Sequence, residues 1–190
     1  MRLSQSVLEA LRRQEEPRHF TPPAKLRVLG VDASLRSTGL GVVEMSQGRL
    51  SYIDARPVKN KPVLRLSECL LNLRNVVDAY IEEFKPEEVA FEGIFFSQNA
   101  RTSLILGHAR GTILSVCAEA GLPAYEYPPR RVKQAATGTG TASKDQMRLM
   151  MQRVLALESL PQEDAADALA IAVTHIHEAG GIAPRSAKLI

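Results

Sequence analysis

Residues 26–45, LRVLGVDASLRSTGLGVVEM, contain two apolar runs separated by a short polar stretch. The first run ends in a carboxylate at Asp32, the letters STG at 37–39 follow as a turn, and LGVVEM resumes the apolar pattern. Short apolar runs bounded by turn residues predict a strand, a tight turn and a second strand. Residues 48–58 alternate between apolar and polar side chains, which predicts a third strand with Gly48 in the hairpin turn. Three strands in direct succession are expected to pair antiparallel.

After residue 60 the chain alternates between helical and extended patterns. Apolar residues recur at three and four positions over 63–84, which predicts an amphipathic helix that ends before Pro86. The further predicted elements are a strand at 87–96, a helix at 99–120, a strand at 123–127, a basic helix at 128–136, a loop at 137–142, a helix at 144–157 that Ser143 and Gln146 start as a capping box, and a last helix that begins within 160–175. Strands joined through helices are expected to pair parallel. The sequence therefore predicts an α/β fold, a mixed sheet covered by helices.

Length and composition favour one domain with an extension at each end. The chain has 190 residues, 45% of them hydrophobic, which is enough for a sizeable core. We expect an N-terminal extension at 1–25, a domain at 26–180 and a C-terminal tail at 181–190. No apolar run is long enough to span a membrane, and the charged N-terminal extension is unlike a secretory signal. Cys69 and Cys117 have neither CxxC spacing nor clustered histidines, so they are expected to be reduced core residues of a cytoplasmic protein.

Charge is unevenly distributed although the net charge is only +3. Between residues 128 and 153 six basic side chains are accompanied by Asp145 alone, whereas residues 154–170 carry four acids and no base. A basic strip beside an acidic group indicates a polyanionic ligand and a metal ion. A solvated helix face beside an acidic helix start would explain either half alone.

Four acids occupy positions where a carboxylate is costly. Asp32 ends the first apolar run, Glu92 lies inside the strand at 87–96, and Asp164 and Asp167 share one face of the last helix. A carboxylate taken out of water costs several kcal/mol unless it is paired or bound to metal. The neighbouring sequence offers no Lys or Arg as an obvious partner. Oxygen ligands without a Cys/His set favour Mg²⁺ or Mn²⁺ over zinc, and two such ions support phosphodiester hydrolysis.

Each acid alone has a simpler interpretation. Asp32 fits an Asx turn at a strand end, and Glu92 fits an exposed position on an edge strand. Asp164 fits an N-cap or a first-turn acid that the helix dipole favours. Asp167 is harder to explain in this way because alanines and Leu169 surround it. The set of four is therefore a stronger signal than any one member.

The sequence resembles a known family, the RuvC-type Holliday-junction resolvases, from Arg27 to His177. Four blocks match in order, and they are VLGVDASLRSTGLGVV (28–43), VAFEGIFFSQNARTSLILGHARGTIL (89–114), YEYPPRRVKQAATGTGTASKDQM (125–147) and DAADALAIAVTHIH (164–177). The resemblance implies a ribonuclease H-like fold, with a mixed five-stranded sheet and helices on both faces. It also implies a homodimeric endonuclease that cuts two opposed strands of four-way DNA in recombination and repair, beside the RuvA–RuvB branch-migration complex. Two Mg²⁺ ions per subunit are implied as cofactors, for which Mn²⁺ can substitute.

The same resemblance implies roles for individual residues. Asp32 and Glu92 match the first two catalytic acids, and Asp164 and Asp167 match the closing acidic pair, so that all four are implied metal ligands. Lys133 and Lys144 match basic residues that hold phosphate close to the metals, and Lys133 is expected to be catalytic by neutralising charge on the phosphate oxygens. The residues implied or expected to bind DNA are Phe95, Arg101, Arg130, Arg131, Lys133, Lys144 and Arg148. Phe95 and the neighbouring Phe96 are expected to face opposite ways, with one ring available to stack on a base, unless both are in the core.

Two features depart from the family, and three rival functions stay open. Ala33–Ser34 replaces the usual Pro-Gly after the first aspartate, which removes easy access to positive φ and predicts a differently shaped loop. Residues 1–25 have no counterpart in the family core.

The rival functions are a nuclease of the same scaffold acting on RNA, an actin-like ATP-binding protein and a non-catalytic junction-binding module. Neither His175 nor His177 is expected to be catalytic, and TGTGTASK lacks the ending of a phosphate-binding loop.

Overall fold

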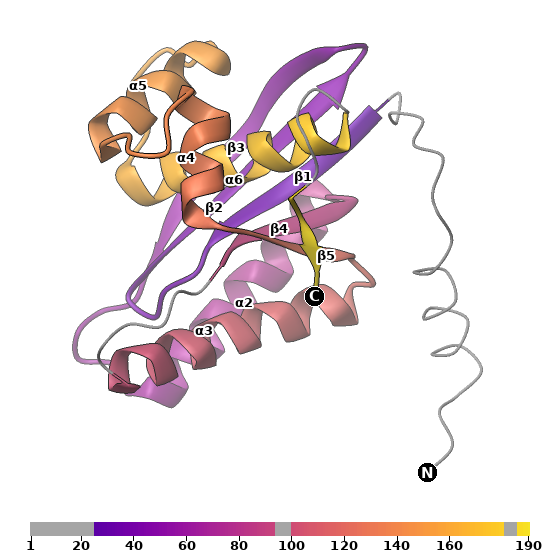
Figure 1. Ribbon diagram of the computed structural model, residues 1–190. Coiled ribbons are helices and arrows are strands. Elements are labelled where there is room, and N and C mark those ends of the chain that lie inside the picture. The colour runs from indigo at the N-terminus through magenta and orange to yellow at the C-terminus, as the bar shows by residue number, and fades with distance from the viewer. Residues whose placement is uncertain (1–24, 94–99, 181–185) are drawn as a thin grey trace.

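The computed structural model describes residues 25–93, 100–180 and 186–190. These residues form a six-stranded sheet in the order β3-β2-β1-β4-β5-β6 (Figure 1). The strands are β1 (Lys25–Asp32), β2 (Ser37–Ser46), β3 (Arg49–Lys59), β4 (Glu88–Glu92), β5 (Ala124–Tyr127) and β6 (Lys188–Leu189). Strands β1, β2 and β3 pair antiparallel, whereas β1, β4 and β5 pair parallel. The mixed sheet predicted from the order of strands and helices is confirmed.

The sheet has one strand more than the five expected. Strand β6 pairs antiparallel with β5, and the N–H of Ile190 donates to the carbonyl of Ala124 at 3.0 Å. It lies in the described part of the predicted C-terminal tail. A two-residue strand carries too little alternation for a sequence pattern to reveal it.

Helices cover both faces of the sheet (Figure 1). They are α2 (Leu66–Phe84), α3 (Ala100–Glu119), α4 (Pro129–Thr137), α5 (Lys144–Val154) and α6 (Glu163–Ala179). Helices α2 and α3 enclose one core, which includes Leu29 and Ile113. Helices α4, α5 and α6 enclose the other, which includes Val28 and Leu169. Successive strand residues point to opposite faces, so Val28 and Leu29 enter different cores.

Helix α5 begins as predicted and ends earlier. Ser143 Oγ accepts a hydrogen bond from the N–H of Gln146 at 3.2 Å, which confirms the capping box. The helix ends at Val154 instead of residue 157. Ala156 has a left-handed φ of 50°, which is incompatible with a continuing helix.

Helix α6 lies very close to β1 and β2 because strand residues beneath it have no side chain. A Cβ atom on Gly30 would lie 2.0 Å from the carbonyl oxygen of Ala168, and one on Gly39 would lie 1.9 Å from that of Asp164. A Cβ atom on Gly41 would also be crowded, at 3.0 Å from a backbone nitrogen of the helix. Since ordinary contacts begin near 3.4 Å, larger residues would push the helix outward. The glycines therefore set the distance between the start of α6 and the strand ends.

The two cysteines are buried and free, as expected. Burial raises the pKa of the Cys117 thiol to about 12, which keeps it protonated and unreactive near neutral pH. Within the described ranges, no helix combines the length and apolarity needed to cross a membrane.

Candidate active site

The structure brings the four predicted acids to one edge of the sheet. Asp32 ends β1 and Glu92 ends the adjacent parallel strand β4, and the register of the two strands sets these residues side by side. Asp164 and Asp167 lie in the first turns of α6, which packs across β1 and β2. Three distant segments of the chain therefore contribute carboxylates to the same place.

Three of these acids line a common cavity of about 270 Å³. Another part of its lining comes from α4 and α5, which contribute Lys133 and Lys144. The lining residues are Asp32, Glu92, Pro129, Val132, Lys133, Ser143, Lys144, Met147 and Asp167. Asp164 is outside this lining, but its carboxylate accepts a hydrogen bond from the Ser37 hydroxyl and adds to the negative potential at two of the lining acids.

Burial and mutual repulsion raise the pKa values of the lining carboxylates. Asp32 is affected most, because desolvation by burial, followed by the charges of the other three acids, raises its pKa to about 7. Burial, then the charge of Asp167, raises the pKa of Glu92. Burial also raises the pKa of Asp167, and Asp164 adds to the effect. Perturbed carboxylates gathered in one cavity are typical of a functional site.

The positions of two acids decide between the open interpretations. The N-cap of α6 is Gln162, so the N-cap interpretation of Asp164 is wrong; Asp164 lies in the first turn of the helix, and its role as a metal ligand stays a prediction. Strand β4 lies between β1 and β5, so the edge-strand interpretation of Glu92 is also wrong. Both carboxylates are held by regular elements rather than by flexible surface loops.

Serine and threonine side chains hold the turn that follows Asp32. Ser34 Oγ donates to the carbonyl of Ser37 at 2.8 Å and accepts from the N–H of Ser37 at 3.1 Å. Thr38 Oγ1 accepts from the N–H of Ser34 at 3.2 Å. Residues with positive φ occur elsewhere in the described chain, not in this turn. The Ala33–Ser34 turn therefore uses no positive-φ conformation, and the serine supplies hydrogen bonds that glycine lacks; the predicted difference in shape from the family's loop stays a prediction.

The chemistry of the acidic wall fits a hard divalent cation. Carboxylate oxygens are the ligands that Mg²⁺ and Mn²⁺ prefer, and no Cys or His is among the described residues that line the cavity. Among the described residues, no three His, Cys, Asp or Glu side chains form a ready-made coordination shell. Repulsion between like charges opposes a closer gathering of the carboxylates without a cation between them.

Two lysines face the acids. Lys133 projects from α4, and Lys144 is the first residue of α5. The charge of each lysine offsets part of the rise in the pKa values of Glu92 and Asp167. Lys144 also forms an ion pair with Glu163, but both side chains are about half exposed, so that this pair holds the lysine only weakly.

Three arginines expected to bind DNA lie on different elements. Arg130, on α4, packs against Gly140 in the loop that follows. Arg148, on α5, donates from Nε to the carbonyl of Pro161 at 2.9 Å. Arg101 is exposed on α3. Their contacts with DNA stay predictions.

Arg131 has a structural contact that the sequence did not indicate. Its Nε donates to Oε1 of Glu178 at 2.7 Å, and Glu178 is only 1% exposed. The same carboxylate accepts hydrogen bonds from the backbone N–H and the hydroxyl of Ser186. This buried ion pair ties α4 to the end of α6, so a DNA contact of Arg131 would come in addition to a packing role.

Two sets of predictions fall outside the described residues. Phe95 and Phe96 lie in the range 94–99, and the N-terminal extension lies almost wholly in 1–24. Their predicted roles therefore stay predictions.

The histidine that follows the acids on α6 is part of the core. His175 is 3% exposed, its Nδ1 lies 2.7 Å from the hydroxyl of Tyr127, and its Nε2 contacts Glu88. It does not belong to the cavity lining. This geometry supports the expectation that it is not catalytic.

Sequence reasoning missed the residues that position the acids. The glycines of β1 and β2 allow α6 to approach, and Ser37 holds Asp164. Glycine inside a strand pattern is a signal of close backbone approach, so the glycine positions were readable. The contact of Ser37 was not, because it joins residues 127 positions apart.

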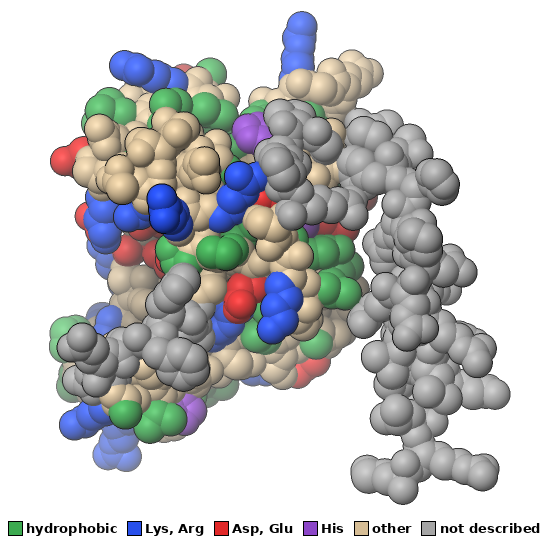
Figure 2. All heavy atoms as spheres, viewed as in Figure 1, with side chains coloured by type: hydrophobic (Ala, Val, Ile, Leu, Met, Phe, Trp, Pro, Cys, Tyr) green, Lys and Arg blue, Asp and Glu red, His purple; other side chains and the backbone are tan. Residues whose placement is uncertain are grey.

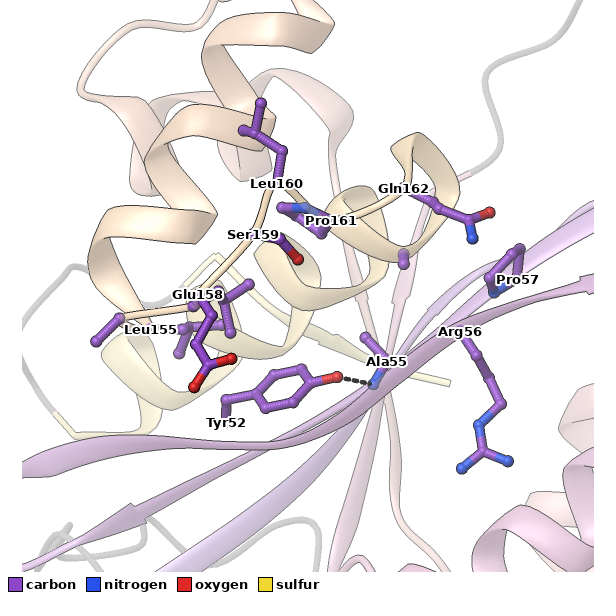
Figure 3. A pocket seen from close by; sticks show the side chains of 13 residues that line it. Tyr52, Ala55, Arg56, Pro57, Leu155, Glu158, Ser159, Leu160, Pro161 and Gln162 are labelled. Atoms are coloured by element: carbon purple, nitrogen blue, oxygen red, sulfur yellow. Dashed lines mark hydrogen bonds between the residues drawn. The ribbon is translucent and has the colours of Figure 1, made fainter.

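A second, larger cavity of about 700 Å³ lies between β3 and the segment that joins α5 to α6, and none of the four acids is among its lining residues (Figure 3). Its charged lining residues are Arg56 and Glu158, and Arg56 pairs with Asp54 at 2.7 Å. The hydroxyl of Tyr52 accepts a hydrogen bond from the N–H of Ala55 at 2.9 Å (Figure 3). This lining lacks a group of perturbed acids, so the chemistry belongs to the smaller cavity.

Comparison with known proteins gives the family. The family model described as crossover junction endodeoxyribonuclease RuvC matches residues 28–175. The crossover junction endodeoxyribonuclease RuvC of Myxococcus xanthus is 42% identical over 161 residues, which cover 84% of each chain. The structure of T. thermophilus RuvC in complex with a Holliday junction substrate has a TM-score of 0.79 and 34% identity, and covers 87% of this chain and 99% of that one.

A more distant structure shares the fold alone. The yeast mitochondrial Holliday junction resolvase Ydc2 has a TM-score of 0.61 at 12% identity, covering 90% of this chain and 85% of its own. Together these likenesses confirm the ribonuclease H-like fold that the sequence resemblance implied. The chain belongs to the RuvC family of crossover junction endodeoxyribonucleases.

Proposed function

We propose that this chain resolves four-way DNA junctions by nicking two opposed strands through metal-dependent phosphodiester hydrolysis. One observation carries the proposal: Asp32, Glu92 and Asp167, from three separate segments, line one cavity together with Lys133 and Lys144. The family match and the junction in the T. thermophilus complex support the same substrate class.

Divalent cations complete the proposed site. Asp32, Glu92, Asp164 and Asp167 would hold them, with Mg²⁺ as the ion in cells, two per subunit, and Mn²⁺ as a substitute. When bound, such a pair activates water for attack on phosphorus and offsets the charge of the departing oxygen. The raised pKa values of the lining acids support this assignment, because positive charge at the cavity would offset both the burial and the repulsion that raise them.

The remaining cavity residues have roles that follow from their charge and polarity. Lys133 and Lys144 would neutralise negative charge that grows on the phosphate oxygens in the transition state. Val132 and Met147 supply an apolar part of the wall. Apolar surroundings strengthen electrostatic interactions by lowering the local dielectric constant. The cavity thereby combines acidic, basic and apolar lining residues, and a phosphate of the DNA would bind among them.

Basic side chains near the cavity would supply most of the DNA affinity. Figure 2 shows Lys and Arg side chains on the α4 and α5 side of the molecule, with acidic side chains set back beside them. We assign phosphate contacts to Arg130, Lys133 and Arg148, with a further contact from Arg101 on α3. Phosphate contacts release counterions, so affinity should fall steeply as salt rises.

A homodimer would present two such cavities to the two opposed strands. Helices α2 and α3 pack together and expose large apolar side chains, at 39% for Leu66, 59% for Leu71 and 65% for Leu104. We place the subunit contact on these two helices because exposed large apolar side chains favour self-association. An association with the RuvA–RuvB complex rests on the family resemblance alone.

The test is cleavage of a synthetic four-way junction with Mg²⁺, with each strand labelled in turn. We expect paired nicks in two opposed strands, leaving 5′-phosphate ends, and no cutting of a linear duplex of the same sequence. An RNA–DNA hybrid is the control for the rival nuclease. Cleavage of the hybrid with an intact junction would overturn the assignment.

A further inference from the structure

The carboxylate of Asp164 is held by a side chain that lies outside the cavity. Ser37 is the first residue of β2, and its hydroxyl donates to Oδ2 of Asp164. Gly39, two residues further along the same strand, allows the backbone of Asp164 to approach, since a Cβ atom there would lie 1.9 Å from the Asp164 carbonyl oxygen. Strand β2 therefore contacts both parts of Asp164: Gly39 lies against its backbone, and Ser37 binds its carboxylate.

The serine is itself fixed. Ser37 pairs with Lys59 in the β2–β3 ladder, and both its N–H and its carbonyl bond to the hydroxyl of Ser34. Ser34 occupies the position where the family usually has glycine, which has no hydroxyl. Two serines thus connect the turn after Asp32 to the first turn of α6.

A carboxylate with one oxygen held by a hydrogen bond has a restricted side-chain rotation. Groups that hold a metal ligand in this way typically contribute about 10–100-fold to metal affinity. We propose that Ser37 is a positioning residue, whose hydroxyl orients the Asp164 carboxylate for divalent cation binding, and that Ser34 supports it through the turn. This inference rests on the proposed metal-dependent function.

The matched test compares Ser37→Thr with Ser37→Val. Both replacements add the same branched shape, which suits a strand, but only threonine keeps a hydroxyl. The measurement is calorimetric titration of Mn²⁺ into the protein without DNA. Val should weaken Mn²⁺ binding about 10-fold or more relative to Thr. Ser46→Ala, at the far end of the same strand, is the control and should bind Mn²⁺ like the natural protein.

Two further measurements separate positioning from folding. In cleavage assays, the Mn²⁺ concentration that gives half-maximal rate should rise for Ser37→Val, while the rate at saturating Mn²⁺ recovers. Ser34→Ala should shift the same midpoint in the same direction by a smaller factor, because the β2–β3 ladder still holds Ser37. A purely structural serine would lower the melting temperature and leave the midpoint unchanged.

The outcomes distinguish this inference from the proposed function. If the natural protein cuts junctions and binds Mn²⁺, but Val and Thr at position 37 bind it within about twofold of each other, the positioning role is refuted and the nuclease function stands. If the natural protein neither binds Mn²⁺ nor cuts junctions, the proposed function itself fails.

Discussion

Replacing Gly39 with alanine tests whether the contact between β2 and α6 controls catalysis. A Cβ atom at this position would lie 1.9 Å from the carbonyl oxygen of Asp164, about 1.5 Å short of the 3.4 Å at which ordinary contact begins. The obstructing atoms belong to the helix backbone, so the start of α6 must move rather than a flexible side chain. Displacement of a reacting group by about 1 Å can cost roughly 100-fold in rate. Gly39→Ala should therefore reduce junction cleavage at saturating Mg²⁺ by about 100-fold or more.

The same substitution should also destabilise the protein. Overpacking of this kind costs about 1–3 kcal/mol. For a domain of this size that corresponds to a fall in melting temperature of roughly 2–12 °C. The assay is single-turnover cleavage of a labelled junction, with junction binding without metal and melting temperature measured in parallel. Binding should survive because the basic side chains come from α4 and α5 rather than from the displaced start of α6.

Gly111→Ala is the matched control. A Cβ atom on Gly111, in α3, would have no neighbour within 4 Å among the residues that the structure describes. Alanine there should stabilise the helix by about 0.5–1 kcal/mol and leave cleavage unchanged. If Gly39→Ala cleaves junctions at the natural rate, the claim that this contact positions the acids is refuted.

Three other predictions concern charge. The pKa of Asp32 rises from an ordinary value of 3.8 to about 7 on folding, so between these pH values the metal-free folded protein binds more protons than the unfolded chain. The protein should therefore lose stability as the pH rises from about 4 to about 7. Thermal melts of Asp32→Asn over this pH range should lack the loss that Asp32 causes. Arg131→Ala removes the cation paired with the buried Glu178 carboxylate, while the hydrogen bonds from Ser186 remain, and should destabilise the protein by about 3–5 kcal/mol, measured by urea unfolding. The dependence of the logarithm of the junction-binding constant on the logarithm of salt concentration separates two roles of Arg131. An unchanged slope in Arg131→Ala would confirm a packing role, and a slope reduced by about 1 would reveal a phosphate contact as well. Lys133→Ala should lower the cleavage rate about 100–1000-fold and the salt slope by about 1, and an unaltered rate would exclude it from the site.

The sequence revealed the elements because their patterns are local. The apolar runs around Asp32 and the spacing of three and four over residues 63–84 each indicate their own secondary structure. The start of α2 was less readable, since it begins at Leu66, where Glu68 accepts a hydrogen bond from the N–H of Arg65 at 2.7 Å. Ends of elements depend on such individual contacts more than on periodicity.

The residue types of the candidate site could be predicted from the sequence, but the contacts that hold the acids in place could not. Four acids in unusual places indicated a shared site, and their positions at strand ends and a helix start are those that bring them together. The ion pair of Arg131 with Glu178 joins residues 47 positions apart, and no local pattern indicates it. Basic residues in one stretch of sequence therefore divide between the cavity and the core according to helix face, which the charge count alone could not resolve.

The most direct test of the central claim is anomalous X-ray diffraction from crystals soaked in Mn²⁺. The claim is that carboxylates of β1, β4 and α6 gather around divalent cations. Anomalous peaks should appear in the cavity lined by Asp32, Glu92 and Asp167, and Asp32→Asn crystals should lose them. Junction cleavage by a protein whose cavity stays free of Mn²⁺ at concentrations that saturate activity would contradict the account.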